Sequence, residues 1–180
     1  MFVSVLEKNQ TRIVDAPLLG CALRLGPEQI ESNKKYLHHC IDAATDHLQS
    51  YVKKSMLTQK LKVRHTNNII ILPFGPVKES DIITVKRKGK ELTKNQDYTI
   101  ECHGDTQKII TPFSWKVHAL EVEYHAGHGH TVDDVPLVYR NSILSLAQDI
   151  FLNKDIDNMT KRIHSFVGNS TKKYALYASS

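Results

Sequence analysis

The spacing between apolar residues changes twice along this chain of 180 residues, from a helical period to a strand period and back. Between residues 27 and 54 the apolar positions follow steps of seven, four, three, four, three and one, at Ile30, Leu37, Ile41, Ala44, Leu48, Tyr51 and Val52. This spacing predicts one helix that ends near Lys54 and buries a single face. A similar pattern after Val135-Pro136 predicts a further helix, with Tyr139, Ile143, Leu146, Ala147 and Ile150 on its buried face.

A shorter helix is expected before residue 27. Asp15 is a good capping residue, and Pro17 falls in the first turn, where its missing N–H costs nothing. This helix is predicted to end near Gly26. Residues 1–14 are expected to form an arm with short strand character.

Between the helices, apolar residues alternate with polar ones in short runs separated by polar turns such as Asn67-Asn68 and Lys88-Gly89. The runs cover residues 57–65, 69–72, 81–87, 90–92, 98–102, 109–110 and 120–124. Short strands at close spacing predict an antiparallel meander and not parallel β-α-β units. The predicted class is α+β: a small helical bundle of two N-terminal helices plus one C-terminal helix, with an inserted antiparallel β-meander. The predicted divisions are an arm and short helix (1–27), the main domain (28–154) and a basic C-terminal tail (155–180).

Charge and composition exclude several classes of protein. The net charge of +5 permits contact with DNA or with an acidic partner but indicates neither. The longest apolar run, residues 69–73, has the length of a strand, so no membrane span or signal peptide is expected and the protein is predicted to be cytosolic. The three cysteines form no CxxC motif, which argues against disulfides and zinc–cysteine sites and favours buried thiols.

The segment HALEVEYHAGHGH contains the densest group of candidate metal ligands, His118, His125, His128 and His130. These imidazoles form either a metal site or a solvated glycine-rich loop. The second interpretation is favoured because no cysteine lies nearby and HExxH is absent. Motifs for a nucleophilic serine (GxSxG) or a phosphate-binding loop (GxGxxG, GxxxxGK[ST]) are also absent. We therefore expect no catalytic residue, no cofactor and no enzymatic activity.

Basic residues gather in two places. Lys86, Arg87, Lys88 and Lys90 surround a predicted hairpin turn, where they either protect an exposed sheet edge or contact phosphates. Lys161, Arg162, Lys172 and Lys173 lie in the tail with Phe166, Tyr174 and Tyr177. This mixture favours a segment that binds a partner over a frayed terminus.

Four segments in this order resemble the head-tail connector, or adaptor, proteins of long-tailed phages and gene transfer agents. They are IDAATDHLQSYVKKSMLTQ, LPFGPVKESDIITVK, the pair Asp97-Tyr98, and LEVEYHAGHGHTVDDVPLVYRNSILSLAQDIFLNKD. The resemblance runs from Glu31 to Lys154. Its fold signature is carried by Pro76, Asp97, Tyr98, Tyr124, Ala126, Gly127, Gly129, Pro136 and Arg140. The chain departs from the family at His128, where an aromatic residue is usual, and in its added N-terminal arm and divergent tail.

The resemblance implies a structural virion protein that joins the DNA-filled head to the tail. Family members form a closed homo-oligomeric ring, twelvefold on the particle, beneath the portal protein. Other implied partners are a stopper or tail-completion protein and passing double-stranded DNA, bound without sequence specificity. In the family, the C-terminal segment engages the portal, which suggests portal binding for Lys161, Arg162, Lys172, Lys173, Tyr174 and Tyr177. The resemblance also implies a tail-side or channel position for the hairpin residues Lys86, Arg87, Lys88 and Lys90.

The expected location is the head–tail junction of a phage, prophage or gene transfer particle made in a bacterial cytoplasm. Two other hypotheses stay open at this stage. The basic balance is compatible with a DNA-binding module of a mobile element. The His118–His130 segment is compatible with a metal-binding protein.

Overall fold

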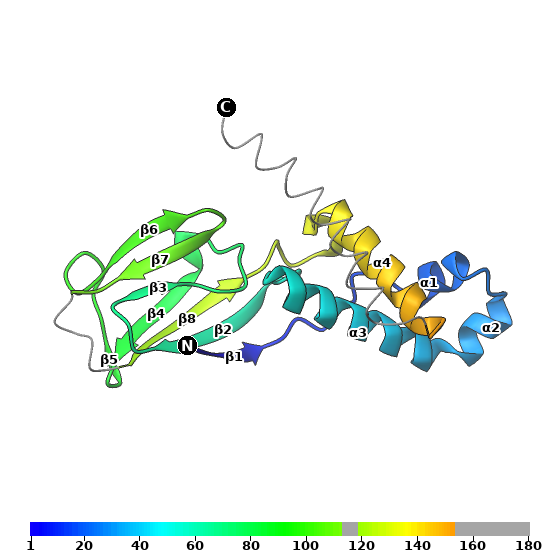
Figure 1. Ribbon diagram of the computed structural model, residues 1–180, viewed down its shortest axis with the longest axis horizontal. Helices are drawn as coiled ribbons and strands as arrows, with labels where there is room; N and C mark the ends of the chain where they lie inside the picture. The colour runs from blue at the N-terminus through cyan, green and yellow to red at the C-terminus, as the bar shows by residue number, and fades with distance from the viewer. Residues whose placement is uncertain (113–118, 154–180) are drawn as a thin grey trace, which may run out of the picture. The chain divides into compact units, whose positions relative to one another are not determined.

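The computed structural model describes residues 1–112 and 119–153, which form two compact units (Figure 1). One unit combines Met1–Gln10 with Lys53–Asp134 and contains the strands. The other combines Thr11–Val52 with the described chain from Val135 onward and contains the main helices. Across these described ranges, every helix is too short or too polar to cross a bilayer.

The helical unit consists of α1 (Ala16–Ala22), α2 (Pro27–Ser32), α3 (Lys34–Val52) and α4 (Leu137–Phe151). Helices α3 and α4 pack together along their apolar faces, and α1 contacts both of them. Most side chains predicted from the helical period are buried: Leu37, Ile41, Ala44, Leu48, Tyr139, Ile143, Leu146 and Ala147. The predicted Ile30, Tyr51, Val52 and Ile150 are only half-buried. The predicted packing of N-terminal helices with a C-terminal helix is therefore confirmed.

The helix boundaries follow local chemistry. The carboxylate of Asp15 accepts a hydrogen bond from the Leu18 amide at 2.7 Å, as expected of the predicted cap. The single helix predicted from residue 27 to 54 is instead divided at Asn33, which separates α2 from α3. The Asn33 side-chain amide donates to the Gln29 carbonyl at 2.8 Å. Such local bonds offer the backbone an alternative to continuous helix, a competition that apolar spacing does not reveal.

The strand unit contains two antiparallel sheets. The first has the order β1-β2-β8-β4-β5, and the second has the order β3-β7-β6. The first sheet comprises β1 (Phe2–Glu7), β2 (Gln59–His65), β8 (Leu120–Ala126), β4 (Ile82–Arg87) and β5 (Lys90–Glu91). The second comprises β3 (Ile69–Ile71), β7 (Thr106–Ile110) and β6 (Thr99–His103). The α+β class with antiparallel strands is confirmed.

The strand order, however, is not that of a simple meander, because β8 lies between β2 and β4. Its alternate residues Leu120, Val122, Tyr124 and Ala126 are all buried. A strand buried along its whole inner face is most stable at the centre of a sheet, where both neighbours shield it from water. The last strand in sequence therefore takes the central position.

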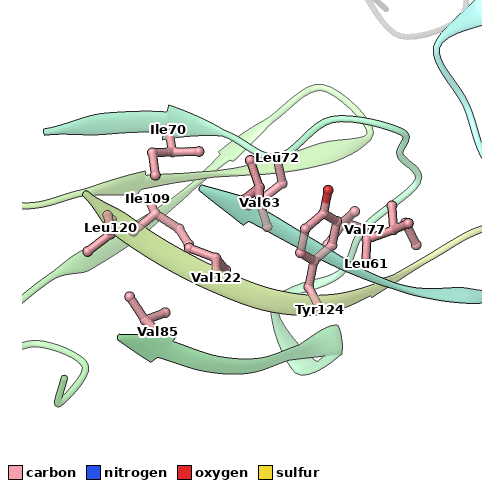
Figure 2. Packing of buried hydrophobic residues seen from close by; sticks show 11 residues of the cluster. Leu61, Val63, Ile70, Leu72, Val77, Val85, Ile109, Leu120, Val122 and Tyr124 are labelled. Carbon is pink, nitrogen blue, oxygen red and sulfur yellow. The ribbon is translucent and has the colours of Figure 1, made fainter. Parts of the chain in front are cut away.

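The core of this unit lies between the two sheets. Figure 2 shows Leu120, Val122 and Tyr124 of β8 directed into the same space as Leu61 and Val63 of β2. From the second sheet, Ile70 and Ile109 close this space, and Leu72 and Val77 of the connecting segment join them. The core therefore depends on residues far apart in the chain.

The prediction of buried thiols holds for Cys40 and is wrong for Cys21 and Cys102, which are exposed and free. Cys21 lies on the outer face of α1, and Cys102 lies on the edge strand β6. The sequence did not indicate this exposure, because Cys21 lies in a helix without other polar side chains and Cys102 lies in an alternating run that gives no sign of being an edge strand.

Candidate functional site

Two segments of the predicted fold signature meet at one end of the five-stranded sheet. The segment Leu72–Val77, which includes Pro76, lies against the glycine-rich loop that follows β8. The Gly127 amide donates to the Pro76 carbonyl at 3.0 Å, and the His128 amide donates to the Met56 carbonyl at 3.2 Å. We refer to the joined segments 54–58, 72–77 and 126–130 as the sheet-end junction.

Close backbone packing explains the glycines of this junction. Gly127 has φ +142, and a Cβ placed on it would lie 2.5 Å from the backbone atoms of Leu57 and Thr58. A Cβ on Gly129 would lie 2.4 Å from the side chain of Asp134. The Gly129 carbonyl also accepts a hydrogen bond from the Thr58 amide at 2.7 Å. These glycines allow three chain segments to approach each other more closely than side chains permit.

The turn between β6 and β7 completes the junction. The Asp105 carbonyl accepts a hydrogen bond from the Val77 amide at 2.9 Å, and its carboxylate forms an ion pair with Lys54. The Tyr124 hydroxyl donates to the Pro73 carbonyl at 2.9 Å. Both sheets are thus attached to the segment 72–77 by hydrogen bonds. The contacts of the junction are those of a structural element that holds the two sheets together.

A cavity of about 240 Å³ opens beside the junction. It is lined by Thr58, Pro76, Lys78, Asp81, His125, Ala126, Gly127, His128, Gly129 and His130. Within residues 1–112 and 119–153, no three His, Cys, Asp or Glu side chains are grouped in a way that could hold a metal ion. His118, the remaining member of the predicted histidine cluster, lies outside the described residues. The cavity therefore gathers three histidines of the cluster at its wall without a metal-binding arrangement among the described side chains.

His128 is half-buried at the junction. Burial lowers the pKa of its imidazole below the ordinary value of 6.5, and the positive charge of Lys54 lowers it further, while Asp105 acts in the opposite direction. The native state thus prefers neutral His128. Below about pH 6.5 the unfolded chain binds this proton more readily than the folded chain, so the contribution of His128 to stability is lost as the pH falls.

Between pH 7.5 and pH 5, we expect the free energy of unfolding to fall less for His128→Gln than for the wild-type protein. Denaturant unfolding at several pH values measures this, and His125→Gln, at an exposed histidine near the end of β8, is the matched control. The other histidines contribute equally to both proteins, so the difference isolates His128. Parallel pH profiles for wild type and His128→Gln would contradict the prediction.

The predicted basic hairpin is formed by β4 and β5. Lys88 and Gly89 make its two-residue turn, with φ of +50 and +77. Lys86 faces Glu91 and Arg87 faces Lys90 across the strands. Lys88 and Lys90 are exposed, whereas Lys86 and Arg87 are half-buried. The structure therefore brings all four predicted basic residues together on one projecting hairpin.

A charged face on the five-stranded sheet was not predicted. On the side opposite the core, the cations of β2 meet the carboxylates of β8: Lys62 Nζ lies 2.8 Å from Glu121, and Arg64 Nε lies 3.3 Å from it. The hydrogen bond from Lys62 holds the pKa of Glu121 below its usual value. The sequence does show alternating cations at Lys60, Lys62 and Arg64 and alternating carboxylates at Glu121 and Glu123. These residues can be recognised as ion-pair partners only once the two strands are known to be neighbours.

The remaining signature residues have structural positions. Asp97 accepts a hydrogen bond from the Thr93 amide at 2.9 Å, and Tyr98 packs against the core. Pro136 precedes α4 as its N-cap, and Arg140 lies half-buried in the first turns of that helix. The tail residues Lys161, Arg162, Lys172, Lys173, Tyr174 and Tyr177 lie outside the described residues.

No protein-family model and no curated protein matches this sequence. The fold is similar to chains of three solved assemblies. One is the neck of an empty gene transfer agent particle computed with C6 symmetry (TM-score 0.66, 15% identity, 84% of each chain covered). The others are the virion of a native gene transfer agent particle (0.68, 13%, 84% of each chain) and the neck of a native particle computed with C12 symmetry (0.60, 13%, 86% of each chain). At such low identity, these matches establish a shared fold.

Proposed function

We propose that this chain is a structural component of the neck of a phage-like particle, and that within the neck it is the adaptor whose ring lies beneath the portal. It acts by holding other proteins in place and not by catalysis. The observation that carries this proposal is the fold shared with chains of gene transfer agent necks over 84% of both chains. This coverage exceeds the share of the chain in either compact unit, so the similarity includes helices and sheets together.

The symmetry of the similar assemblies supports a ring. Two of them were computed with sixfold and twelvefold symmetry. Copies related by rotation about one axis contact each other head to tail, so each copy needs two different and complementary surfaces. A chain of two compact units can provide these surfaces on separate parts of its structure. We propose a twelvefold ring for this chain.

The basic hairpin and the tail are assigned to the two ends of this ring. We assign the tail, through Lys161, Arg162, Lys172, Lys173, Tyr174 and Tyr177, to the portal protein. Lys86, Arg87, Lys88 and Lys90 face the stopper or tail-completion protein or the channel. The exposure of Lys88 and Lys90 at the hairpin turn suits both positions, and a few phosphate contacts would allow DNA to pass without holding it tightly.

A sequence-reading DNA-binding module is the second candidate, and the same basic hairpin is the observation that favours it. Two-stranded ribbons enter the major groove in some DNA-binding proteins. Here β5 is only two residues long, so the ribbon presents few side chains to base edges, and the lysines at its turn can contact phosphates whatever the sequence. The hairpin therefore fits contact with DNA of any sequence better than readout of a site.

The proposed function predicts that the chain associates with itself or with the portal protein, and a measurement of molar mass in solution can detect this. We expect the full chain to form a ring-sized species alone, or to join its cognate portal protein as a ring, in light scattering at low and high concentration. A chain ending at Asn153 is expected to keep its self-association and to lose the portal. A full-length chain that stays monomeric at every concentration and ignores the portal would refute the adaptor role.

A further inference from the structure

The short helix α1 exposes apolar side chains that no described part of the chain covers. All seven of its residues, Ala16–Ala22, lack polar side chains apart from the thiol of Cys21. Ala16, Leu19 and Gly20 are buried, whereas Pro17, Leu18, Cys21 and Ala22 are exposed, with Leu18 at 51%. A helix that is apolar on all sides is normally buried on all sides. We call these four exposed residues the α1 patch.

The edge strand β1 carries a second exposed apolar group in the other compact unit. Met1, Phe2, Val5 and Leu6 are all exposed, with Phe2 at 69%. β1 pairs with β2 on one side and forms the open edge of the five-stranded sheet. Edges of this kind are usually protected by lysine or proline, and β1 contains neither. We call these four residues the β1 patch.

We infer that the β1 patch of one copy of this chain docks on the α1 patch of the next copy around the ring. This inference rests on the proposed ring and names the two surfaces that its head-to-tail contact requires. The patches differ in structure and lie in different units, as a heterologous contact demands. The side chains of both patches are uncharged, so joining them buries apolar surface.

Charges at the ends of the patches are complementary. Within the β1 patch, Phe2, Val5 and Leu6 lie along β1 between Arg64, which faces Phe2 across the strands, and Glu7 at the other end of the strand. The α1 patch lies between Asp15 at the start of α1 and Arg24 just after it. One orientation pairs Arg64 with Asp15 and Glu7 with Arg24. The charged ends are roughly 17 Å apart along β1 and roughly 14 Å apart along α1 and its final turn, so both pairs can form together.

The local geometry of β1 favours a helix over an added strand as the occupant. The register of β1 shifts between Val5 and Glu7, which interrupts regular pairing along the edge. Bulges of this kind twist an edge away from strand addition. Side-chain contacts with a helix do not need a regular edge. Glu7 is available for such a contact because its side chain is 74% exposed, although it lies 3.7 Å from Lys60.

Charge reversal with mixing tests this contact. Glu7→Arg and Arg24→Glu each place like charges in every subunit contact, and we expect each to weaken ring formation about tenfold or more in sedimentation velocity. When the two variants are mixed in equal amounts and alternate around the ring, positions 7 and 24 carry opposite charges across every contact. The mixture should therefore form rings although neither variant does so alone. A contact within one chain cannot be restored by mixing.

Two apolar substitutions complete the test. Leu18→Ser and Phe2→Ser should each weaken assembly, whereas Leu137→Ser, at a 61% exposed leucine outside both patches, should leave it unchanged. Circular dichroism and thermal melting confirm that each variant is folded. Rings of unchanged stability in the single charge variants, or failure of the folded mixture to assemble, would overturn the contact while leaving the adaptor role intact. A wild-type chain that forms no ring with or without portal would overturn both.

Discussion

Replacing Gly127 with alanine should destabilise the protein by about 4 kcal/mol, which is a large part of the stability of a small domain. The new Cβ would lie 2.5 Å from the backbone of Leu57 and Thr58, and the residue would also have to keep φ +142. Backbone atoms cannot rotate away as a side chain can. Relief requires the sheet-end junction to open, with loss of the bond from Gly127 to the Pro76 carbonyl. Denaturant unfolding, or loss of soluble protein, measures the effect.

Gly104→Ala is the matched control. Gly104 also has a positive φ, +63, but a Cβ added there would meet nothing within 4 Å. The expected cost is only about 1 kcal/mol, from backbone strain alone. Equal losses in the two variants would mean that the crowding at Gly127 has no energetic consequence, and that the junction is looser than its hydrogen bonds indicate.

The second large effect is expected at Tyr124. Tyr124→Ala removes a fully buried ring from between the sheets and should cost about 4 kcal/mol. Tyr124→Phe keeps the ring but removes the 2.9 Å hydrogen bond to the Pro73 carbonyl, at a cost of about 1 kcal/mol. Burial raises the pKa of this hydroxyl, which therefore remains a donor throughout the neutral range. Unfolding midpoints in denaturant separate the two contributions.

Tyr98→Phe serves as the control for the hydroxyl, because Tyr98 packs against the same core from a half-buried position. The free energy of unfolding of Tyr98→Phe should differ from that of the wild type by less than about 0.5 kcal/mol. If Tyr124→Phe is as stable as the wild type, the bond to Pro73 contributes nothing, and the attachment of segment 72–77 depends on its other hydrogen bonds.

Several local features were predicted because short-range chemistry determines them. Asp15 caps α1, Lys88-Gly89 turns the basic hairpin, and Pro136 precedes the last helix. The break at Asn33 was missed because a side-chain bond within one turn competes with helix and leaves apolar spacing unchanged. The exposure of Cys21 was missed because a helix without polar residues has the pattern of a buried one.

Of the candidate site residues, the sequence identified Pro76, Gly127 and Gly129 through the resemblance to a family, and the basic hairpin through its cluster of charges at a predicted turn. Neither signal showed what these residues contact. The structure explains the glycines by the chain segments that pass beside them. The sequence did not predict the ion pairs between β2 and β8, because about sixty residues separate Lys62 from Glu121 and only the fold brings them together.

By itself, the sequence determined most of the helices and strands, their order and the α+β class, because periodic spacing and capping act within a few residues. Only the tertiary structure decided that β8 lies between β2 and β4, that Pro76 meets Gly127, and that no described part of the chain covers the α1 and β1 patches. The physical reason is burial. Local periodicity shows which face of a helix or strand is apolar, but whether that face is covered, and by which segment, depends on the packing of the whole chain against itself.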